Sequence, residues 1–225
     1  MVPPVVRSCL RVCARRDPHG QPRLWQHGHV PQPRVVAVSR DDQHRFSKVP
    51  VDSITLVAGH GVEGDAHAGA FVKHRSRVKR DPQQPNLRQV HLIHAELFDE
   101  ALAQGYELGP GDLGENVLTE GLDLLGLPTG ALLDLGGPVV RLTGLRNPCV
   151  QINRFRSGLI RVVLAKADGT PATRPAPSTG STRPSAPVIR KAGVMAVVVS
   201  GGEVVPGGSI TVTFPAEPHT PLAPV

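Results

Sequence analysis

The chain has 225 residues, an ordinary apolar share of 40% and a low aromatic share of 3%. This length allows one good hydrophobic core, or at most two small ones. No stretch approaches the roughly 20 apolar residues of a membrane-spanning helix, and three cysteines are too few for a disulfide framework. We therefore expect no membrane segment and a reducing, cytoplasmic environment.

The net charge of +6 is concentrated in two segments outside the expected folded body. Residues 1–34 carry six Arg against one Asp, and residues 166–187 carry three basic side chains against one Asp. Because the remainder is close to neutral, the basic balance is weak evidence for a DNA-binding domain. We expect that nucleic acid is not a partner. The alternative, nucleic-acid binding through the basic tail, requires residues 1–33.

The first 33 residues are predicted to be a disordered N-terminal extension. They show no sustained period of 2 or 3.6, and six prolines interrupt any amphipathic helix. Cys9 and Cys13 have no further ligands nearby for a zinc site, so we interpret them as incidental thiols. The folded domain is expected to cover residues 34–225.

In the first half of this domain, short β-prone runs at residues 35–38, 54–58 and 89–94 predict strands. Residues 95–104 predict a short helix, since the apolar residues Leu97, Phe98, Ala101 and Leu102 fall on one side of it. Gly105 is suited to the position after the helix end. Residues 109–121 are predicted to be a loop rich in glycine and acidic residues.

In the second half, residues 131–135 and 139–145 predict a hairpin joined by Gly136, Gly137 and Pro138. Apolar residues at helical spacing predict a helix over residues 154–165. The segment 166–187 contains five prolines with Ser, Thr and Gly, so we expect a flexible insertion. The last strands are predicted at residues 194–200 and 209–214.

Many short strands with few helices predict a mainly β domain, either a barrel or a sandwich. The sequence has no alternating strand–helix pattern and no G-x-G-x-x-G motif after a strand. A dinucleotide-binding Rossmann fold is therefore excluded.

Cys149 is the most informative residue for chemistry. It follows the apolar run at 139–145 in the tetrapeptide Arg146-Asn147-Pro148-Cys149. The proline makes the backbone before the thiol stiff, and the nearby arginine favours a thiolate. A thiolate suits a soft-metal ligand, a sulfur carrier or a nucleophile. The alternative is a buried structural cysteine.

Two glycine-rich loops are candidates for ligand contact. In Pro110–Asn116, glycine allows the backbone N–H groups to approach a ligand closely, and Glu115 and Asn116 offer an acceptor and an amide. Asp65 lies in a similar loop after Gly64. The alternative is that both loops are tight turns in which Asp and Asn bond to their own backbone.

Basic and histidine side chains are also frequent in the first half of the domain. A basic loop could hold an anion or could be a solvated charge run; its members are Lys73, His74, Arg75, Arg77, Lys79, Arg80 and Arg88. Five histidines invite a zinc hypothesis, but no metal-binding motif accompanies them; they are His60, His67, His74, His91 and His94. In a strand at 89–94, His91 and His94 would point to opposite faces.

Five motifs occur in the order of one known family. They are Gly61-Val-Glu-Gly-Asp-Ala-His67, Arg88-Gln-Val-His-Leu-Ile93, Pro110-Gly-Asp-Leu-Gly-Glu-Asn-Val117, Gly121-Leu-Asp-Leu124 and Arg141-Leu-Thr-Gly-Leu-Arg-Asn-Pro-Cys149. With them the chain resembles the molybdenum cofactor sulfurase C-terminal (MOSC) domain family, in its stand-alone bacterial form. The resemblance covers residues 34–165 and 190–214. Residues 1–33 and 166–187 do not fit the family pattern.

The resemblance implies a β-barrel fold with a pocket for the molybdenum–pyranopterin cofactor. It also implies that Cys149 is the molybdenum ligand or carries a persulfide sulfur for the metal. The residues expected to contact the cofactor are Arg88, Gly111, Asp112, Gly114, Glu115, Asn116, Arg146 and Asn147.

Three functions remain open from the sequence. The first is an oxidoreductase that reduces N-hydroxylated compounds, and the second is a sulfur carrier or cofactor chaperone without turnover. The third is a molybdenum-independent hydrolase or transferase in which Cys149 pairs with a histidine. The chain has no desulfurase domain and no Cys₄ iron–sulfur cluster. The first two functions therefore imply a separate redox partner or sulfur donor.

Overall fold

The computed structural model describes residues 32–72, 83–166 and 188–225. These residues contain thirteen strands and three short helices, so the expected mainly β class is confirmed. Most of the predicted N-terminal extension, the basic segment 73–82 and nearly all of the predicted insertion lie outside the described residues. Within the described residues, no helix is both long and apolar enough to cross a membrane.

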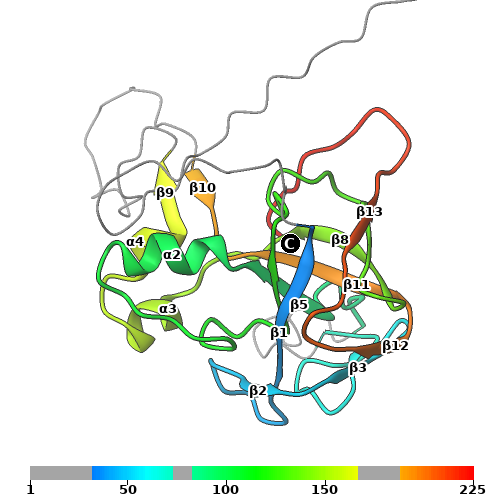
Figure 1. Cartoon of the computed structure of the whole chain (residues 1–225), viewed down its shortest axis with the longest axis horizontal. Helices are drawn as coiled ribbons and strands as arrows, with labels where there is room; N and C mark the ends of the chain where they lie inside the picture. Colours follow the sequence, from blue (N-terminus) through cyan, green and yellow to red (C-terminus); the bar gives the residue numbers. More distant parts are fainter. Residues whose placement is uncertain (1–31, 73–82, 167–187) are drawn as a thin grey trace, which may run out of the picture. The chain divides into compact units, whose positions relative to one another are not determined.

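The central sheet has eight strands in the order β13–β7–β8–β11–β5–β6–β1–β2 (Figure 1). Neighbouring strands are antiparallel, except that β5 and β6 run parallel. The bounds are β1 (Arg34–Arg40), β2 (Val49–Val51), β5 (Val90–His94), β6 (Val117–Glu120), β7 (Leu132–Asp134), β8 (Val139–Leu145), β11 (Val194–Ser200) and β13 (Thr211–Thr213). A second sheet joins β12 (Gly202–Val204), β3 (Ile54–Val57) and β4 (Gly61–Val62), and a third joins β10 (Val188–Arg190) and β9 (Leu164–Lys166).

The expected closed barrel is wrong for the part of the chain that the structure describes. The edge strands β2 and β13 have three residues each and do not pair with one another. The start of β1 meets the segment before β13 only in a single bridge, between Arg34 and Ser209. Backbone hydrogen bonds of Val35 with Gly207 and Gly208 support this bridge. These contacts join the start of β1, the strand beside the edge strand β2, to the segment before β13 without forming a continuous ladder.

The sheet separates two hydrophobic cores. Residues of β5 and β6 contribute to both, because successive side chains of a strand point to opposite faces. In β5, Leu92 lies in the larger core and Ile93 in the smaller one, and in β6 the same holds for Val117 and Leu118. Strands buried on both faces carry continuous apolar runs rather than an alternating pattern.

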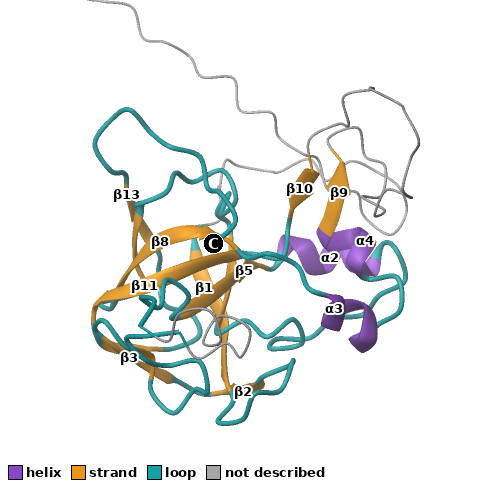
Figure 2. Cartoon of the chain, turned by 180° about the vertical axis from the view of Figure 1, so that it is seen from behind, coloured by secondary structure: helices purple, strands orange, loops and turns teal. Residues whose placement is uncertain are grey.

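The helices α2 (Glu96–Leu102), α3 (Val150–Phe155) and α4 (Ile160–Val163) cover the smaller core. Figures 1 and 2 show them grouped on one side of the sheet, close to β9 and β10. The predicted helix at 95–104 is confirmed as α2. The predicted helix at 154–165 is only partly confirmed, because α3 ends at Phe155, Arg156 is extended (φ −139°, ψ 118°), and α4 covers only Ile160–Val163.

Strand prediction is most accurate at the centre of the sheet. The runs at 139–145 and 194–200 match β8 and β11, which pair with each other. The prediction of a loop over the whole segment 109–121 is wrong at its end, because residues 117–120 form β6. This strand is short and fully packed, so it gives no alternating signal.

Candidate functional site

Cys149 lies in the turn between β8 and α3, where it is partly exposed to solvent. Its thiol donates to Gln151 Oε1 at 3.4 Å. The start of this turn is fixed by three backbone hydrogen bonds. The Arg146 N–H donates to the Gly193 carbonyl at 2.9 Å, and Leu145 exchanges bonds of 2.8 and 3.1 Å with Ala223 and Val225. The thiol is therefore reachable from solvent on a firmly anchored turn.

Arg146 connects this turn to the glycine-rich loop. Burial lowers the pKa of its guanidinium, and the neighbouring Cys149 and Glu115 act in the opposite direction. Its Cζ atom lies 5.9 Å from the centre of the Phe46 ring, a cation–π contact. The Nη1 atom is shielded from solvent and has no hydrogen-bond partner among the described residues. Arg146 thus places positive charge between the thiol and a carboxylate.

Glu115 is that carboxylate, and its residue is 1% exposed. Its Oε1 atom accepts the Gly111 N–H, whereas Oε2 is buried without a partner in the described part of the chain. Burial raises the pKa of Glu115, opposed by backbone hydrogen bonds and by Arg146. Buried polar groups without partners are rare in proteins and point to a missing ligand or water. Glu115 and Arg146 each present one such group.

A second group of buried polar side chains lies next to this pair. Lys48 Nζ donates to Asp65 Oδ2 at 2.6 Å, and both side chains are nearly enclosed. Asn116 donates to the same oxygen at 3.0 Å and to the Ser39 carbonyl at 3.1 Å. Burial lowers the pKa of Lys48, against the attraction of Asp65 and of Glu115. This network ties together loops that are distant in sequence.

Sequence reasoning misses Lys48 entirely. One lysine among polar loop residues carries no pattern that predicts burial, and only the pairing with Asp65 makes burial tolerable. Burial by itself would raise the pKa of Asp65, but hydrogen bonds from His67 and the charge of Lys48 hold it well below its usual range. The sequence indicates Asp65 as a loop candidate, and the structure gives it a role in joining loops.

The glycines at 111 and 114 serve the packing of the protein backbone. Their φ angles are +84° and +78°. A Cβ atom at Gly111 would lie 2.2 Å from the Lys48 carbonyl oxygen, and one at Gly114 would lie 2.5 Å from that of Phe46. Both amides are used inside the loop, since Gly111 donates to Glu115 and Gly114 donates to the Gly111 carbonyl. The absence of a side chain therefore allows the Gly111–Gly114 loop to pack closely against the backbone of residues 46–48.

Asn116 forms two hydrogen bonds with the backbone of His91 in β5. Its Oδ1 accepts the His91 N–H at 3.2 Å, and its own backbone N–H donates to the His91 carbonyl at 2.8 Å. The imidazole Nε2 of His91 lies 2.8 Å from the Ala192 carbonyl. Burial, with a smaller effect from Arg146, holds the pKa of His91 well below its usual range, so the ring is neutral. His91 is thus a packed core residue beside the Arg146 turn.

Three other residues expected at the cofactor occupy less central positions. Asp112 is half-buried, and its Oδ2 accepts the Gly109 N–H at 2.8 Å. Asn147 is exposed in the Cys149 turn, and Arg88 is half-buried just before β5. The role of all three toward a cofactor stays a prediction. Across residues 32–72, 83–166 and 188–225, no group of three or more His, Cys, Asp or Glu side chains is arranged to hold a metal ion.

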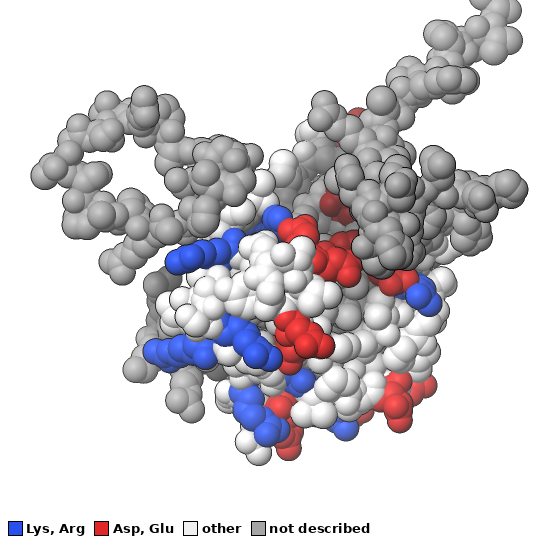
Figure 3. Space-filling model, turned by 60° about the vertical axis from the view of Figure 1, so that its left-hand side comes forward, with Lys and Arg blue, Asp and Glu red and all other residues white. Residues whose placement is uncertain are grey.

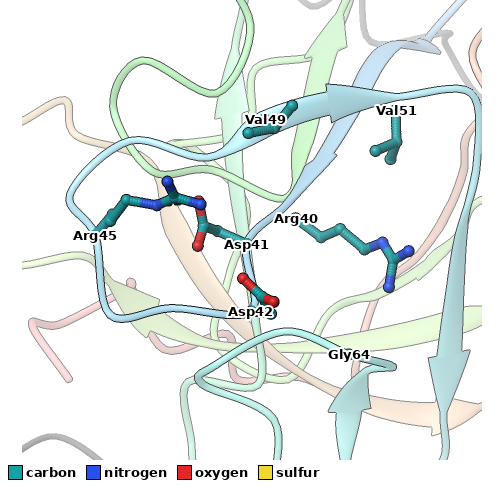
Figure 4. Close-up of a pocket in the computed structure, with 7 residues that line it drawn as sticks. All are labelled: Arg40, Asp41, Asp42, Arg45, Val49, Val51 and Gly64. Atoms are coloured by element: carbon teal, nitrogen blue, oxygen red, sulfur yellow. Dashed lines mark hydrogen bonds and ion pairs between the residues drawn. The ribbon is translucent and has the colours of Figure 1, made fainter.

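Two surface hollows lie elsewhere on the protein. One of about 220 Å³ lies between the end of β1, the following loop and β2 (Figure 4). Arg40, Arg45, Asp41 and Asp42 line it, so its charges balance, and Arg45 donates to Asp41 at 2.8 Å. The other, of about 290 Å³, lies between residues 125–128 and the segment 214–222. Neither hollow is lined by Cys149, Arg146 or Glu115.

The residues around Cys149 fit the pyranopterin cofactor in chemical type. A partly exposed thiol is a suitable soft ligand for a metal. The unpaired Arg146 Nη1 offers a donor for a phosphate or a ring carbonyl, and the unpaired Glu115 Oε2 offers an acceptor for ring N–H groups. The donor set therefore matches a ligand that carries both an anionic group and a polar heterocycle.

The fold and the turn define a mainly β protein with a reactive-cysteine candidate between β8 and α3. The family model of the MOSC domain matches residues 66–211, which is more than half of the chain. The chain therefore belongs to the MOSC domain family, as its motifs predict. No curated protein matches the chain.

Two solved structures show the same fold. The YuaD protein from Bacillus subtilis superposes with a TM-score of 0.61 at 23% identity, covering 82% of this chain and 97% of that one. YiiM from Geobacillus stearothermophilus superposes with a TM-score of 0.52 at 15% identity, covering 80% of this chain and 75% of that one. At these identities the similarity extends to the fold alone.

Proposed function

We propose that this chain binds the molybdenum cofactor and that Cys149 is the molybdenum ligand or carries a persulfide sulfur for the metal. The family supports a role connected with the molybdenum cofactor in general. The observation that carries the finer proposal is the juxtaposition of Cys149, Arg146 and Glu115, in which the last two each retain a buried, unpaired polar atom within the described residues. The proposed setting is the cytoplasm.

The protein groups have distinct tasks in this proposal. Cys149 supplies the soft sulfur ligand, and Gln151 holds its thiol in the free protein. Arg146 neutralises negative charge on the bound group. Glu115 accepts hydrogen bonds from the ring of the cofactor through Oε2. When bound, the cofactor supplies a metal that exchanges two electrons with an oxygen-bearing substrate.

The reaction that we propose is the reduction of N-hydroxylated compounds with electrons from an external donor protein. The alternative within the same site is a sulfur carrier or cofactor chaperone that performs no turnover. In that role Cys149 carries a sulfur atom as a persulfide, which a separate donor supplies. The same anchored turn and the same positive charge serve both roles, so the metal environment and the sulfur content must be measured.

A molybdenum-independent cysteine hydrolase or transferase is less well supported. Such an enzyme needs a base within hydrogen-bond reach of the thiol. In the described residues the hydrogen bond of Cys149 is to the amide of Gln151, and the buried imidazole of His91 bonds to the Ala192 carbonyl. Neither contact gives the thiol a proton acceptor of the required basicity.

X-ray absorption at the molybdenum edge of cofactor-loaded protein tests the ligand role. We expect one more sulfur neighbour in the wild type than in Cys149→Ala, because the side chain is the only change at the turn. The double variant Cys9→Ser/Cys13→Ser is the matched control and should retain the full sulfur count. An unchanged spectrum in Cys149→Ala would reject metal ligation by this residue.

Cyanide treatment of the purified protein distinguishes the two roles. A sulfur that cyanide releases from the wild type, but not from Cys149→Ala, together with no reduction of an N-hydroxy substrate, identifies the carrier. Bound molybdenum with substrate reduction, when a chemical reductant supplies the electrons, identifies the oxidoreductase. Turnover of a hydrolytic substrate without molybdenum would contradict both.

A further inference from the structure

The surface next to Cys149 has an unusual charge pattern. From Asn147 to Lys166 the sequence contains four basic residues and no acidic one. Arg154 and Arg156 at the end of α3, and Arg161 in α4, are all exposed. None of these three arginines forms an ion pair with any residue that the structure describes. Three guanidinium groups without a described carboxylate partner therefore lie on the two helices that follow the thiol.

An exposed apolar residue begins α3, directly after Cys149. Val150 directly follows Cys149 and is 69% exposed, which is the largest exposure of any large apolar side chain in the described chain. Isolated exposed apolar residues are common. Here, however, the residue directly adjoins a partly exposed thiol and is followed by arginines. An apolar centre with a charged rim is the usual composition of a protein-binding surface.

Acidic side chains also lie on the helix that packs against α4. Figure 3 shows Lys and Arg side chains mostly on the left of this view, several of them directly beside Asp and Glu side chains, with further basic side chains at the bottom and right. Helix α2, which packs against α4, carries Glu96, Asp99 and Glu100. Among the described residues, no ion pair joins these acidic side chains to the three arginines. Glu100 pairs instead with Lys191.

We propose that Val150, Arg154, Arg156 and Arg161 form a docking surface for a protein partner that presents Asp and Glu side chains around an apolar centre. Complementary charge accelerates the encounter of two proteins and sets their orientation. The orientation matters here because the surface adjoins the thiol, so a partner bound to it lies next to Cys149. This surface goes beyond the proposed function, and docking requires no molybdenum.

Binding of an acidic [2Fe–2S] ferredoxin, used as the probe, tests the proposal with the full-length chain. At about 0.01 M ionic strength the Debye length is about 30 Å, so charge complementarity is fully expressed. We expect fluorescence anisotropy of the labelled ferredoxin to report binding that disappears near 1 M salt. Arg154→Glu/Arg161→Glu should weaken it about tenfold or more, since each reversal replaces an attraction by a repulsion.

The matched control is Arg34→Glu/Arg141→Glu, which changes the net charge equally but lies on β1 and β8. It should weaken binding less than about twofold, a change well under 1.4 kcal/mol. Val150→Ser should weaken binding several-fold without altering its salt dependence. If a charge-reversed protein does not fold, as judged by its circular dichroism, Arg154→Gln/Arg161→Gln replaces it and should weaken binding by a smaller factor.

Three outcomes would overturn the proposal. The first is no ferredoxin binding at low salt. The second is equal weakening by the two double variants, which would mean that only net charge matters. The third is that a DNA duplex binds more tightly than ferredoxin and loses its affinity in the same α3–α4 variant, which would make this a nucleic-acid surface. None of these outcomes bears on metal ligation by Cys149, so a failure here leaves the proposed function intact.

Discussion

Two groups of buried polar side chains lie next to each other in this protein, and they differ in how they are paired. In the loop network, Lys48, Asp65 and Asn116 bond to one another and to the backbone of distant loops. In the Cys149 turn and the loop beside it, Arg146 and Glu115 each keep one buried polar atom without a partner among the described residues. The first group has its hydrogen-bonding capacity used by the fold, whereas the second keeps unpaired atoms, which the proposed function assigns to a ligand.

This difference separates residues whose polar atoms are fully paired from those to which we assign a ligand-binding role, although the two kinds look alike in sequence. Glu115 and Asn116 are neighbours in the same loop, yet the Asn116 amide donates twice within the protein and Glu115 leaves an oxygen unpaired in the described chain. The consequence is that substitutions in the loop network should affect mainly stability. Substitutions in the Cys149 turn should affect mainly binding.

The largest effect is expected from Lys48→Met. The substitution leaves the Asp65 carboxylate buried without its counter-ion, which typically costs about 3–5 kcal/mol of unfolding free energy. Urea unfolding measures the loss. Lys48→Met/Asp65→Asn should recover most of it, because the remaining amide is neutral and still accepts hydrogen bonds. If Lys48→Met lowers the unfolding free energy by less than about 1 kcal/mol, the loop network does not have the structural role that distinguishes it from the Cys149 turn.

A smaller loss is expected from Gly111→Ala. A left-handed backbone costs an L-residue about 1–2 kcal/mol, and the clash with the Lys48 carbonyl should add about 1–3 kcal/mol. Gly59→Ala is the matched control, since Gly59 has a φ of +66° and no atom lies within 4 Å of the position that an added methyl group would take. If urea unfolding shows equal losses of stability in the two variants, the loop backbone at Gly111 shifts to make room for the added methyl group.

The next effect is a dependence of stability on acid pH. Because the folded pKa of Asp65 is lowered, its contribution is present above the unfolded pKa of about 3.9 and is lost as pH falls toward the folded value. Asp65→Asn should therefore cost about 1–3 kcal/mol near neutral pH, and this cost should begin to shrink as pH falls below about 4. Thermal unfolding across this range tests the expectation, which a pH-independent difference would contradict.

Glu115→Gln should show the opposite sign. The folded pKa of Glu115 is raised by burial, so the native protein binds the proton more tightly than the unfolded chain does. The stability of the wild type then falls as pH rises from the unfolded pKa of about 4.3 through the folded value. The variant, which cannot ionise, should gain stability relative to the wild type as pH rises above about 4.3. A relative loss over that range would show that Arg146 compensates the charge completely.

The smallest effect on stability is expected from Cys149→Ala. The side chain is partly exposed and its hydrogen bond to Gln151 is long, so unfolding free energy should change by less than about 0.5 kcal/mol. Molybdenum content after cofactor loading should nevertheless fall. A large loss of stability would instead support a structural role for this cysteine.

The sequence predicts the strands that alternate or carry long apolar runs, such as residues 139–145 and 194–200. It does not predict β6, whose four residues follow a glycine loop, or the break between α3 and α4, which begins where Arg156 becomes extended. The sequence also does not predict whether the eight-stranded sheet closes into a barrel or stays open. That outcome depends on three-residue edge strands that no local pattern reveals.

For the candidate site, the sequence identifies Cys149, Arg146 and Glu115 but cannot separate their roles from those of Gly111 and Asn116. Glycine content predicts a close backbone approach without saying to what, and here the approach is to residues 46–48. Lys48 is missed because the partner that makes its burial possible lies 17 residues away. Only contacts in three dimensions show which polar atoms remain unpaired.

The hydrogen bonds that anchor the Cys149 turn have a consequence for biosynthesis. Leu145 and Arg146 are held by Gly193, Ala223 and Val225, all of which are synthesised after Cys149. During translation from the N-terminus, the turn therefore leaves the ribosome before the residues that fix it. A group that needs the finished turn, such as the proposed cofactor, can therefore be loaded only after Val225 has been synthesised.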